Sequence, residues 1–327
     1  MMKNLKRRSL LHAVGSALAL SPFAAFAAFP ERVIRLIVPF APGGNADIVG
    51  RLVAAGMSEA LGQPVIVENR AGAGGGIGAD LVAHSAPDGY TLFSGSNGPL
   101  TVNPFVQAKL GYDPLKDFAP IGLTSLVPHA LIVNAAVPAK TLPELIALSK
   151  KQQVGIGTSG IGSATHLTLE RFNAQTGAKL LHVPYKGGGA LLPDLIAGTI
   201  QGAMTEISAA LPHHRSGKAR FVAIASAKRS ALASEVPTMI EAGVKDFTAA
   251  SYIGVLAPAG VPADVMARLQ AALVSALHSP KTLDRFREMG AEAATPEQMT
   301  PAGFGAFIRQ DYERSREAAQ LAGLKKE

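Results

Sequence analysis

The sequence predicts a two-lobed α/β protein, with a mostly parallel sheet flanked by helices in each lobe and a ligand cleft between the lobes. A buried strand, a glycine loop and a helix follow one another at residues 33–61, and the same arrangement recurs at residues 154–175. Strands that alternate with helices favour parallel sheets covered on both faces. The length of 327 residues is typical of about two domains.

The composition supports a large core and excludes several kinds of chemistry. Hydrophobic residues make up 48% of the chain and charged residues 17%. There is no cysteine, which excludes disulfides, thiol nucleophiles and thiolate metal sites. The composition is therefore that of a folded protein whose chemistry depends on oxygen and nitrogen donors.

Residues 1–27 are predicted to be an export signal rather than part of the fold. Four basic residues precede an apolar run at residues 10–20, and Ala25-Phe26-Ala27 is typical of a cleavage site just after Ala27. The pair Arg7-Arg8 leaves the general and the twin-arginine export routes both open. Without this segment the formal charge falls from +7 to +3, and no block of basic and aromatic residues remains. Nucleic acid is therefore not an expected partner.

The opening stretch of the mature chain predicts an anion site. Branched apolar residues at 33–38 predict a buried strand, and Pro42-Gly43-Gly44 ends it. Asn45 is suited to cap the following helix, which is expected at residues 48–61, and Asp47 lies in its first turn. The first amides of a helix have no partners inside it, so such a loop can hold an anion.

The remaining elements follow from local patterns. Further strands are expected at residues 64–68, 90–93, 121–127, 130–133, 154–157, 179–183, 221–224 and 252–256, with another near 200–204. Helices are expected at residues 79–83, 142–150, 164–175, 190–198, 263–277 and 302–320. The second half is thus inserted between the strand-rich first half and a helical return. We expect one lobe at residues 28–128 with 251–327, and the other at 129–250.

Three loops are candidates for the ligand site. The loops at 40–47 and 158–166 each end a strand and open a helix, and in open α/β sheets ligands bind beyond the carboxyl ends of the strands. A third polar loop covers residues 94–97. Hydroxyl groups in these loops can donate to carboxylate oxygens without burying a counter-charge. The sequence therefore predicts a site for a small mono- or dianion between the lobes.

Several residues near these loops have two interpretations. Asp47 either stabilises its helix end or contacts a ligand ammonium group or water. His166 either reaches the cleft or has a local structural role. Tyr185 either closes over the cleft or packs against its lobe, and Lys186 is either a ligand cation or solvated.

Motifs for catalysis are weak or absent. Gly74-Gly75-Gly76-Ile77-Gly78-Ala79 matches a loose dinucleotide fingerprint, but it follows the second strand and lacks the acidic partner. The sequence has no G-x-S-x-G or S-x-x-K motif. His84, His129, His166, His182, His213 and His214 have no metal-ligand spacing. We therefore expect no enzyme activity, no cofactor and no metal.

The order and spacing of these motifs resemble one family along essentially all of the mature chain. The chain is similar to the substrate-binding proteins of tripartite tricarboxylate transporters, called Bug-type receptors. The residues that carry the resemblance are Pro39–Gly44 with Asp47 and Arg51, Leu61–Gly75, Pro87–Leu92, Gly160–Ser163 with His166, His182–Gly187, Val236–Thr238 with Glu241–Gly243, and Ala257–Gly260.

The resemblance implies a monomeric periplasmic receptor of the type II, Venus-flytrap kind. It further implies a small organic carboxylate as ligand, and large and small membrane subunits of a transporter as partners. Carried over by position, the ligand-binding residues are Phe40, Ala41, Pro42, Gly43, Gly44, Asp47, Ser94, Ser96, Asn97, Thr158, Ser159, Gly160, Ser163, His166, Tyr185 and Thr205.

One departure from the family pattern bears on the ligand. Where the family is expected to have an aspartate, this chain has Thr205, followed by Glu206. If such an acid recognises a ligand amine, its displacement favours a carboxylate without an ammonium group.

Two alternative functions remain at this point. The same cleft could serve an exported hydrolase or dehydrogenase, or a receptor that signals to a sensor protein instead of a permease.

Overall fold

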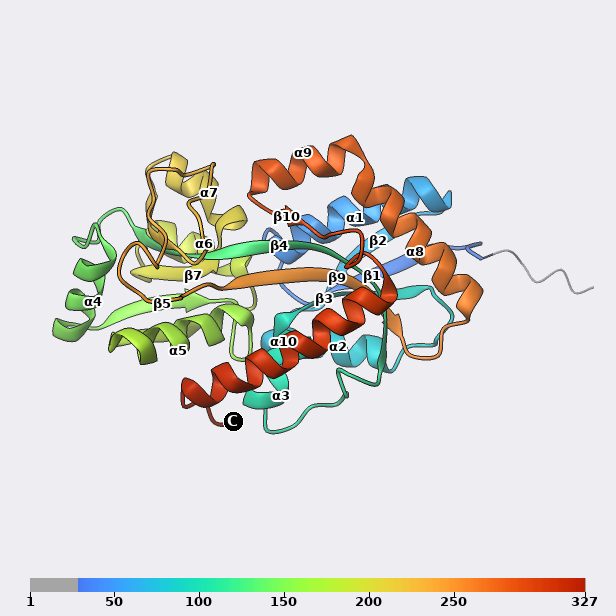
Figure 1. Ribbon diagram of the computed structural model, residues 1–327, viewed down its shortest axis with the longest axis horizontal. Coiled ribbons are helices and arrows are strands. Elements are labelled where there is room, and N and C mark those ends of the chain that lie inside the picture. The colour runs from blue at the N-terminus through green and yellow to red at the C-terminus, as the bar shows by residue number, and fades with distance from the viewer. Residues whose placement is uncertain (1–28, 327) are drawn as a thin grey trace, which may run out of the picture.

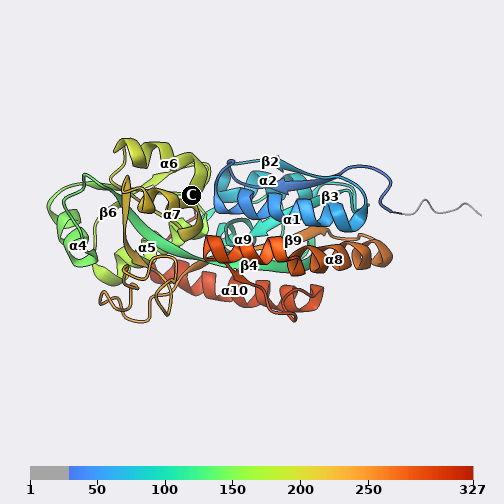
Figure 2. The same cartoon turned by 90° about the horizontal axis from the view of Figure 1, so that it is seen from above.

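The computed structural model of the chain describes residues 29–326, so the predicted export signal lies outside the described residues. Two α/β lobes lie end to end, joined through one long strand (Figures 1 and 2). None of the helices at residues 29–326 is both long enough and apolar enough to cross a membrane.

The first lobe is built on three parallel strands. Strand β1 (Ile34–Val38) lies between β2 (Val65–Asn69) and β3 (Thr91–Ser96), and β9 (Ala250–Pro258) pairs antiparallel with β3. Helices α1 (Asn45–Leu61), α2 (Gly76–Ala83) and α8 (Ala263–His278) flank this part of the sheet. Helix α1 ends at Gly62, whose φ of 68° is the left-handed conformation that glycine adopts most readily.

The second lobe repeats this plan. Strand β5 (Val154–Thr158) lies between β6 (Leu180–Pro184) and β7 (Gly202–Glu206), both parallel to it. The helices are α4 (Leu142–Lys151), α5 (Ala164–Thr176), α6 (Gly188–Ala197) and α7 (Ile207–Arg215). Helix α4 begins with a complete capping box: the side chains of Thr141 and Glu144 each accept a hydrogen bond from the backbone amide of the other residue. Strand β8 (Ala219–Ile224) completes the lobe.

Strand β4 (Phe118–Asn134) runs through both lobes, and it corrects the prediction of two separate strands around Pro128-His129. From Phe118 to Pro128 it pairs with β9, and from His129 to Asn134 it pairs with β7 and β8 (Figure 1). Proline has no amide to donate, so it interrupts a strand least where the strand changes partners. Tertiary pairing therefore overrides the local break signal.

The core divides in the same way as the sheet. One large cluster of buried apolar side chains fills the first lobe, and two clusters cover the two faces of the second lobe's sheet. Local patterns also missed helices α7 and α9 (Pro280–Met289), and the helical turns η1 (Ala73–Gly75), η2 (Gly98–Val102) and α3 (Asn103–Val106). Short strand β10 (Glu292–Ala293) precedes helix α10 (Pro301–Leu321), which lies along β4 towards α5 (Figure 1).

Candidate functional site

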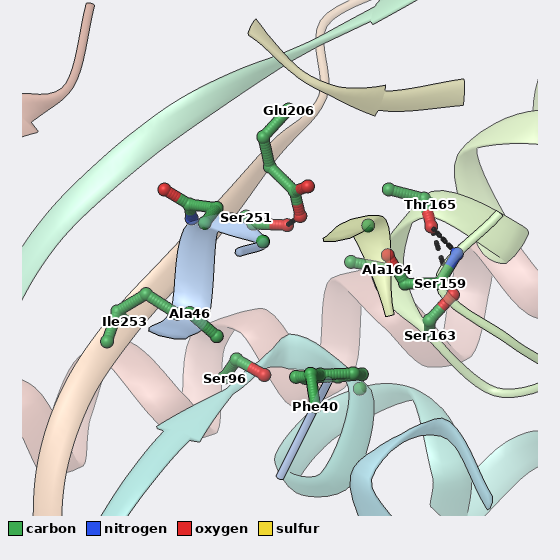
Figure 3. Close-up of a pocket in the computed structure, with 14 residues that line it drawn as sticks. Phe40, Ala46, Ser96, Ser159, Ser163, Ala164, Thr165, Glu206, Ser251 and Ile253 are labelled. Atoms are coloured by element: carbon green, nitrogen blue, oxygen red, sulfur yellow. Dashed lines mark hydrogen bonds between the residues drawn. The ribbon is translucent and has the colours of Figure 1, made fainter. Parts of the chain in front are cut away.

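A small cavity lies between the lobes, and residues from both lobes line it (Figure 3). Its volume is about 20 Å³, which is room for about one ordered water. An organic acid therefore requires the lobes to part before it can enter. The lining residues are Phe40, Gly44, Asn45, Ala46, Ser96, Gly98, Ser159, Ser163, Ala164, Thr165, Gly188, Glu206, Ser251 and Ile253.

Four helix N-termini contribute to this lining: those of α1, α5 and α6, and that of α7, whose N-cap residue is Glu206. The backbone amides at a helix N-terminus carry partial positive charge and lack partners inside the helix. Three of the helices, α5, α6 and α7, come from the second lobe, and α1 comes from the first. The cavity is therefore electropositive at several points without a lysine, arginine or histidine among its lining residues.

The loop that leads into α1 is held from behind by Asp47. Its carboxylate accepts from the Gly43 amide at 3.0 Å, from the Arg51 guanidinium at 2.9 Å and from the Asn69 amide at 2.9 Å. Burial acts to raise the pKa of Asp47, but these hydrogen bonds outweigh it and hold the pKa below its ordinary value. Asp47 does not line the cavity, so it positions the loop in this conformation.

The corresponding loop before α5 is held by its own hydroxyl groups. Ser163 caps the helix by accepting from the His166 amide at 3.1 Å. Thr165 Oγ1 accepts from the Ser159 amide at 2.9 Å, and Thr158 Oγ1 accepts from the Gly160 amide at 3.2 Å. Gly160 has a φ of 115°, which only glycine adopts readily, so the chain can turn sharply here.

Direct contacts between the lobes show that this conformation is closed. The Ala41 amide donates to the Lys186 carbonyl at 2.9 Å, and Ser208 Oγ donates to Asn45 Oδ1 at 3.1 Å. Gly44 lies so close to Gly189 that a Cβ atom on Gly44 would be 3.0 Å from the Gly189 nitrogen. Glycines at this junction allow the backbones of the two lobes to approach.

Two polar atoms of the lining have no hydrogen-bond partner in the protein. These atoms are Asn45 Nδ2 and Ser96 Oγ, and both are buried. A buried donor without a partner costs about 1–3 kcal/mol, so native proteins rarely leave one unused. The atoms are therefore suited to ligand oxygens or to an ordered water.

His166 and His182 lie behind the α5 loop and pack on each other. Their ring centroids are 4.1 Å apart and their planes differ by 20°. Glu170 brings a third potential ligand atom within 4.8 Å, so the three residues could be read as a metal centre. However, one nitrogen of each ring already has a partner in the protein: His166 Nδ1 accepts from the Gly162 amide at 3.3 Å, and His182 Nε2 lies 2.7 Å from Thr158 Oγ1. Burial lowers the pKa of His166 to about 3 and that of His182 to about 4, so both rings are neutral.

The sequence-predicted site residues separate into two groups. Phe40, Gly44, Ser96, Ser159 and Ser163 line the cavity. The others lie outside the lining in this conformation: Ala41, Pro42, Gly43, Asp47, Ser94, Asn97, Thr158, Gly160, His166, Tyr185 and Thr205.

Most residues of the second group have other partners. Asn97 donates to Asp311 of α10 and accepts from the Tyr252 amide at 2.9 Å. Tyr185 donates to Asp194 at 2.6 Å, and burial with that carboxylate raises the pKa of Tyr185 to about 12. Ser94 and Ser96 belong to strand β3, which corrects the prediction of a loop there.

Sequence reasoning missed several lining residues. Asn45, Ala46, Ala164 and Thr165 lie within the loops predicted at 40–47 and 158–166 but were not among the individual ligand-binding residues carried over from the family. Gly188 opens helix α6, three positions after Tyr185. Gly98 follows the third loop directly. Ser251 and Ile253 belong to β9, which no local motif links to the cleft. Pairing with β3 places Ile253 opposite Ser96, and pairing with β4 places Ser251 opposite Val127.

Comparison with known proteins supports one family. Residues 49–324 match the model of the tripartite tricarboxylate transporter family receptors. The chain is 38% identical over 300 residues to protein BugT of Bordetella pertussis, with 91% of each chain covered.

Two solved structures are similar along nearly the whole chain. One is Rpa4515 of R. palustris with adipate, at a TM-score of 0.87 and 33% identity, covering 91% of this chain and all of that one. The other is MatC of Rhodopseudomonas palustris with bound malate, at a TM-score of 0.85 and 34% identity, covering 89% of this chain and 99% of that one. With its two lobes and interlobe cavity, the chain belongs to the tripartite tricarboxylate transporter receptor family.

Proposed function

We propose that the chain is a periplasmic receptor that captures a small organic carboxylate between its lobes and delivers it to a tripartite tricarboxylate-type transporter. The observation that carries this proposal is the meeting of four helix N-termini and two unpartnered polar atoms at one interlobe cavity. Helix N-termini bind carboxylates through backbone amides. The relatives with adipate and malate have the same fold and family.

Closure of the lobes gives the receptor its working cycle. An open form admits the ligand, and the contact of the α1 loop with Lys186 and Gly189 then encloses it. The closed form presents one joined surface, which a membrane partner can distinguish from the open form. We propose that this partner comprises a large and a small membrane subunit, and that the receptor acts as a monomer.

The partner change of β4 supports the proposed lobe limits of 28–128 with 251–327, and 129–250. Bending at this boundary separates the lobes without breaking the pairing inside either one. We also propose that the chain binds its ligand without turnover, after export and removal of residues 1–27.

A thermal-shift screen of residues 28–327 tests the ligand class. A ligand at 100 times its dissociation constant stabilises the folded state by about 2.7 kcal/mol, which raises the melting temperature by about 5 °C for a chain of this size. Organic acids including adipate and malate are compared with the matching diols, which lack the carboxylates. If diols raise the melting temperature as much as acids, or if no acid raises it, the carboxylate assignment is wrong.

A further inference from the structure

One ionisable side chain lines the cavity, and it is acidic. Glu206 ends strand β7, is 8% exposed, and directs its carboxylate towards the space above Ser96 and Phe40 (Figure 3). The lining contains no lysine, arginine or histidine. The sequence-based preference for a ligand without an ammonium group assumed that the acid was displaced from the site. The structure removes that premise, because Glu206 lines the cavity and Thr205 does not.

The protein partners of Glu206 are neutral hydroxyl groups. Ser251 Oγ donates to Oε1 at 2.7 Å, and Thr205 Oγ1 donates to Oε2 at 3.3 Å. None of the ion pairs within residues 29–326 includes Glu206. A buried carboxylate is costly unless an opposite charge or enough donors compensate it. Glu206 is also the N-cap residue of α7, whose N-terminus supplies only partial positive charge and makes no hydrogen bond to the side chain. Glu206 can therefore accept a further donor.

The chain of hydrogen bonds behind Ser251 does not supply that donor. Ser251 Oγ also lies 2.8 Å from His129 Nε2, and His129 Nδ1 lies 2.9 Å from Thr168 Oγ1, which contacts the Ala164 carbonyl at 2.9 Å. The network has four contacts in a row: Glu206 with Ser251, Ser251 with His129, His129 with Thr168, and Thr168 with the Ala164 carbonyl. With a neutral imidazole it holds only three protons, one on each hydroxyl group and one on the ring. One of the four contacts is therefore left without a proton.

His129 does not bring a positive charge to this network. It is fully buried, and desolvation together with nearby Arg171 lowers the pKa of His129 to about 3. The network therefore leaves Glu206 without an opposite charge. The cavity is the side from which a ligand can bring one.

We propose that Glu206 is a specificity-determining residue that pairs with an ammonium group of the ligand, so that the receptor's ligand is a small amino-carboxylate. The inference rests on the proposed function. The ligand carboxylate binds at the N-termini of α1 and α5, where Asn45 Nδ2 and Ser96 Oγ are unpartnered. The ammonium group then supplies both the counter-charge and the donor that Glu206 lacks. A plain dicarboxylate would instead place like charge beside it.

Matched acids that differ only in an ammonium group test the inference. Isothermal titration of ligand-free protein, prepared by unfolding and refolding, compares aspartate with succinate, glutamate with glutarate, and alanine with propionate. We expect the wild type to bind the amino member of at least one pair tenfold or more tightly. Glu206→Gln should reduce that preference to threefold or less. The control variant Glu235→Gln removes an exposed charge that pairs with His214 outside the lining, and it should leave the preference for the amino member unchanged.

Three outcomes would overturn the inference. The first is a wild type that prefers the ammonium-free acids, which leaves the carboxylate receptor intact but removes the role of Glu206. The second is an unchanged preference in a Glu206→Gln variant whose circular dichroism and melting temperature show that it is folded. The third is proton uptake when succinate binds, measured as a difference in binding enthalpy between two buffers, that disappears in Glu206→Gln. This would show that Glu206 accommodates the acid by taking up a proton and not by pairing with an ammonium group. If no acid of either kind binds, the proposed function itself fails.

Discussion

Replacing Gly189 with alanine tests whether closure of the lobes holds the ligand. A Cβ atom on Gly189 would lie 2.1 Å from the Pro42 carbonyl oxygen and 2.8 Å from the Gly44 nitrogen. Both atoms belong to the first lobe, whereas Gly189 belongs to the first turn of α6 in the second lobe. The clash therefore exists only when the lobes are closed.

The structure gives the size of the effect. Ordinary contact begins at 3.4 Å, so closure must stop about 1.3 Å short, the difference between 3.4 and 2.1 Å. The hydrogen bond from Ala41 to Lys186, now 2.9 Å long, then lies beyond hydrogen-bond range. With the neighbouring bond from Ser208 to Asn45 also weakened, the loss is about 1–3 kcal/mol, or roughly 5- to 150-fold in affinity.

Calorimetric affinity and small-angle scattering measure the two consequences. Gly189→Ala should bind the ligand more weakly and should remain more extended at saturation, while its free form keeps the wild-type melting temperature or gains slightly from the helix preference of alanine. Gly305→Ala in α10 is the matched control, because its Cβ would make only ordinary contacts, at 3.6 Å to Arg309 Nη1 and 3.7 Å to Pro120 Cγ. Wild-type affinity and compaction in Gly189→Ala would refute closure as the basis of binding.

Three further predictions concern the site and its supports. Ser96→Ala should weaken binding about 2- to 10-fold without lowering the melting temperature. Ser94 is also buried and unpartnered but lies outside the lining, so Ser94→Ala should not change the affinity. Equal losses of affinity in the two variants would contradict the assigned lining. Asp47→Asn should cost roughly 1–3 kcal/mol of unfolding free energy at pH 7, measured by urea denaturation. The difference between variant and wild type should shrink as the pH falls through the lowered folded-state pKa of Asp47. A difference that stays constant down to pH 2 would show that the charge of Asp47 does not stabilise the fold. Burial raises the pKa of Asp311 despite hydrogen bonds from Thr101 and Asn97, so its ionisation opposes folding as the pH rises, at about 1.4 kcal/mol per pKa unit. Asp311→Asn should therefore raise the melting temperature at pH 7 and not at pH 4, and a lower value at both would show that the carboxylate is needed.

Local patterns in the sequence determined the parts of the molecule whose physics is local. A run of branched apolar residues predicted β1, because a strand buried on both faces needs them, and a shorter run predicted the edge strand β2. Pro42-Gly43-Gly44 and the loop around Gly160 predicted where helices would begin. The order of these motifs also indicated the family, because the same order and spacing persist along the chain.

The tertiary structure decided which of these residues meet. Asp47 and Asn45 are two positions apart on one helix, yet only Asn45 lines the cavity, because the first turn points Asp47 back towards Arg51 and Asn69. Ser251 reaches the site through the pairing of β9 with β4, a contact between residues more than a hundred positions apart. Glu206 became a site residue because β7 ends beside Ser251. Helix caps and strand patterns depend on neighbours in the chain, whereas a cleft depends on how two lobes approach, and that distance is set by packing across the whole fold.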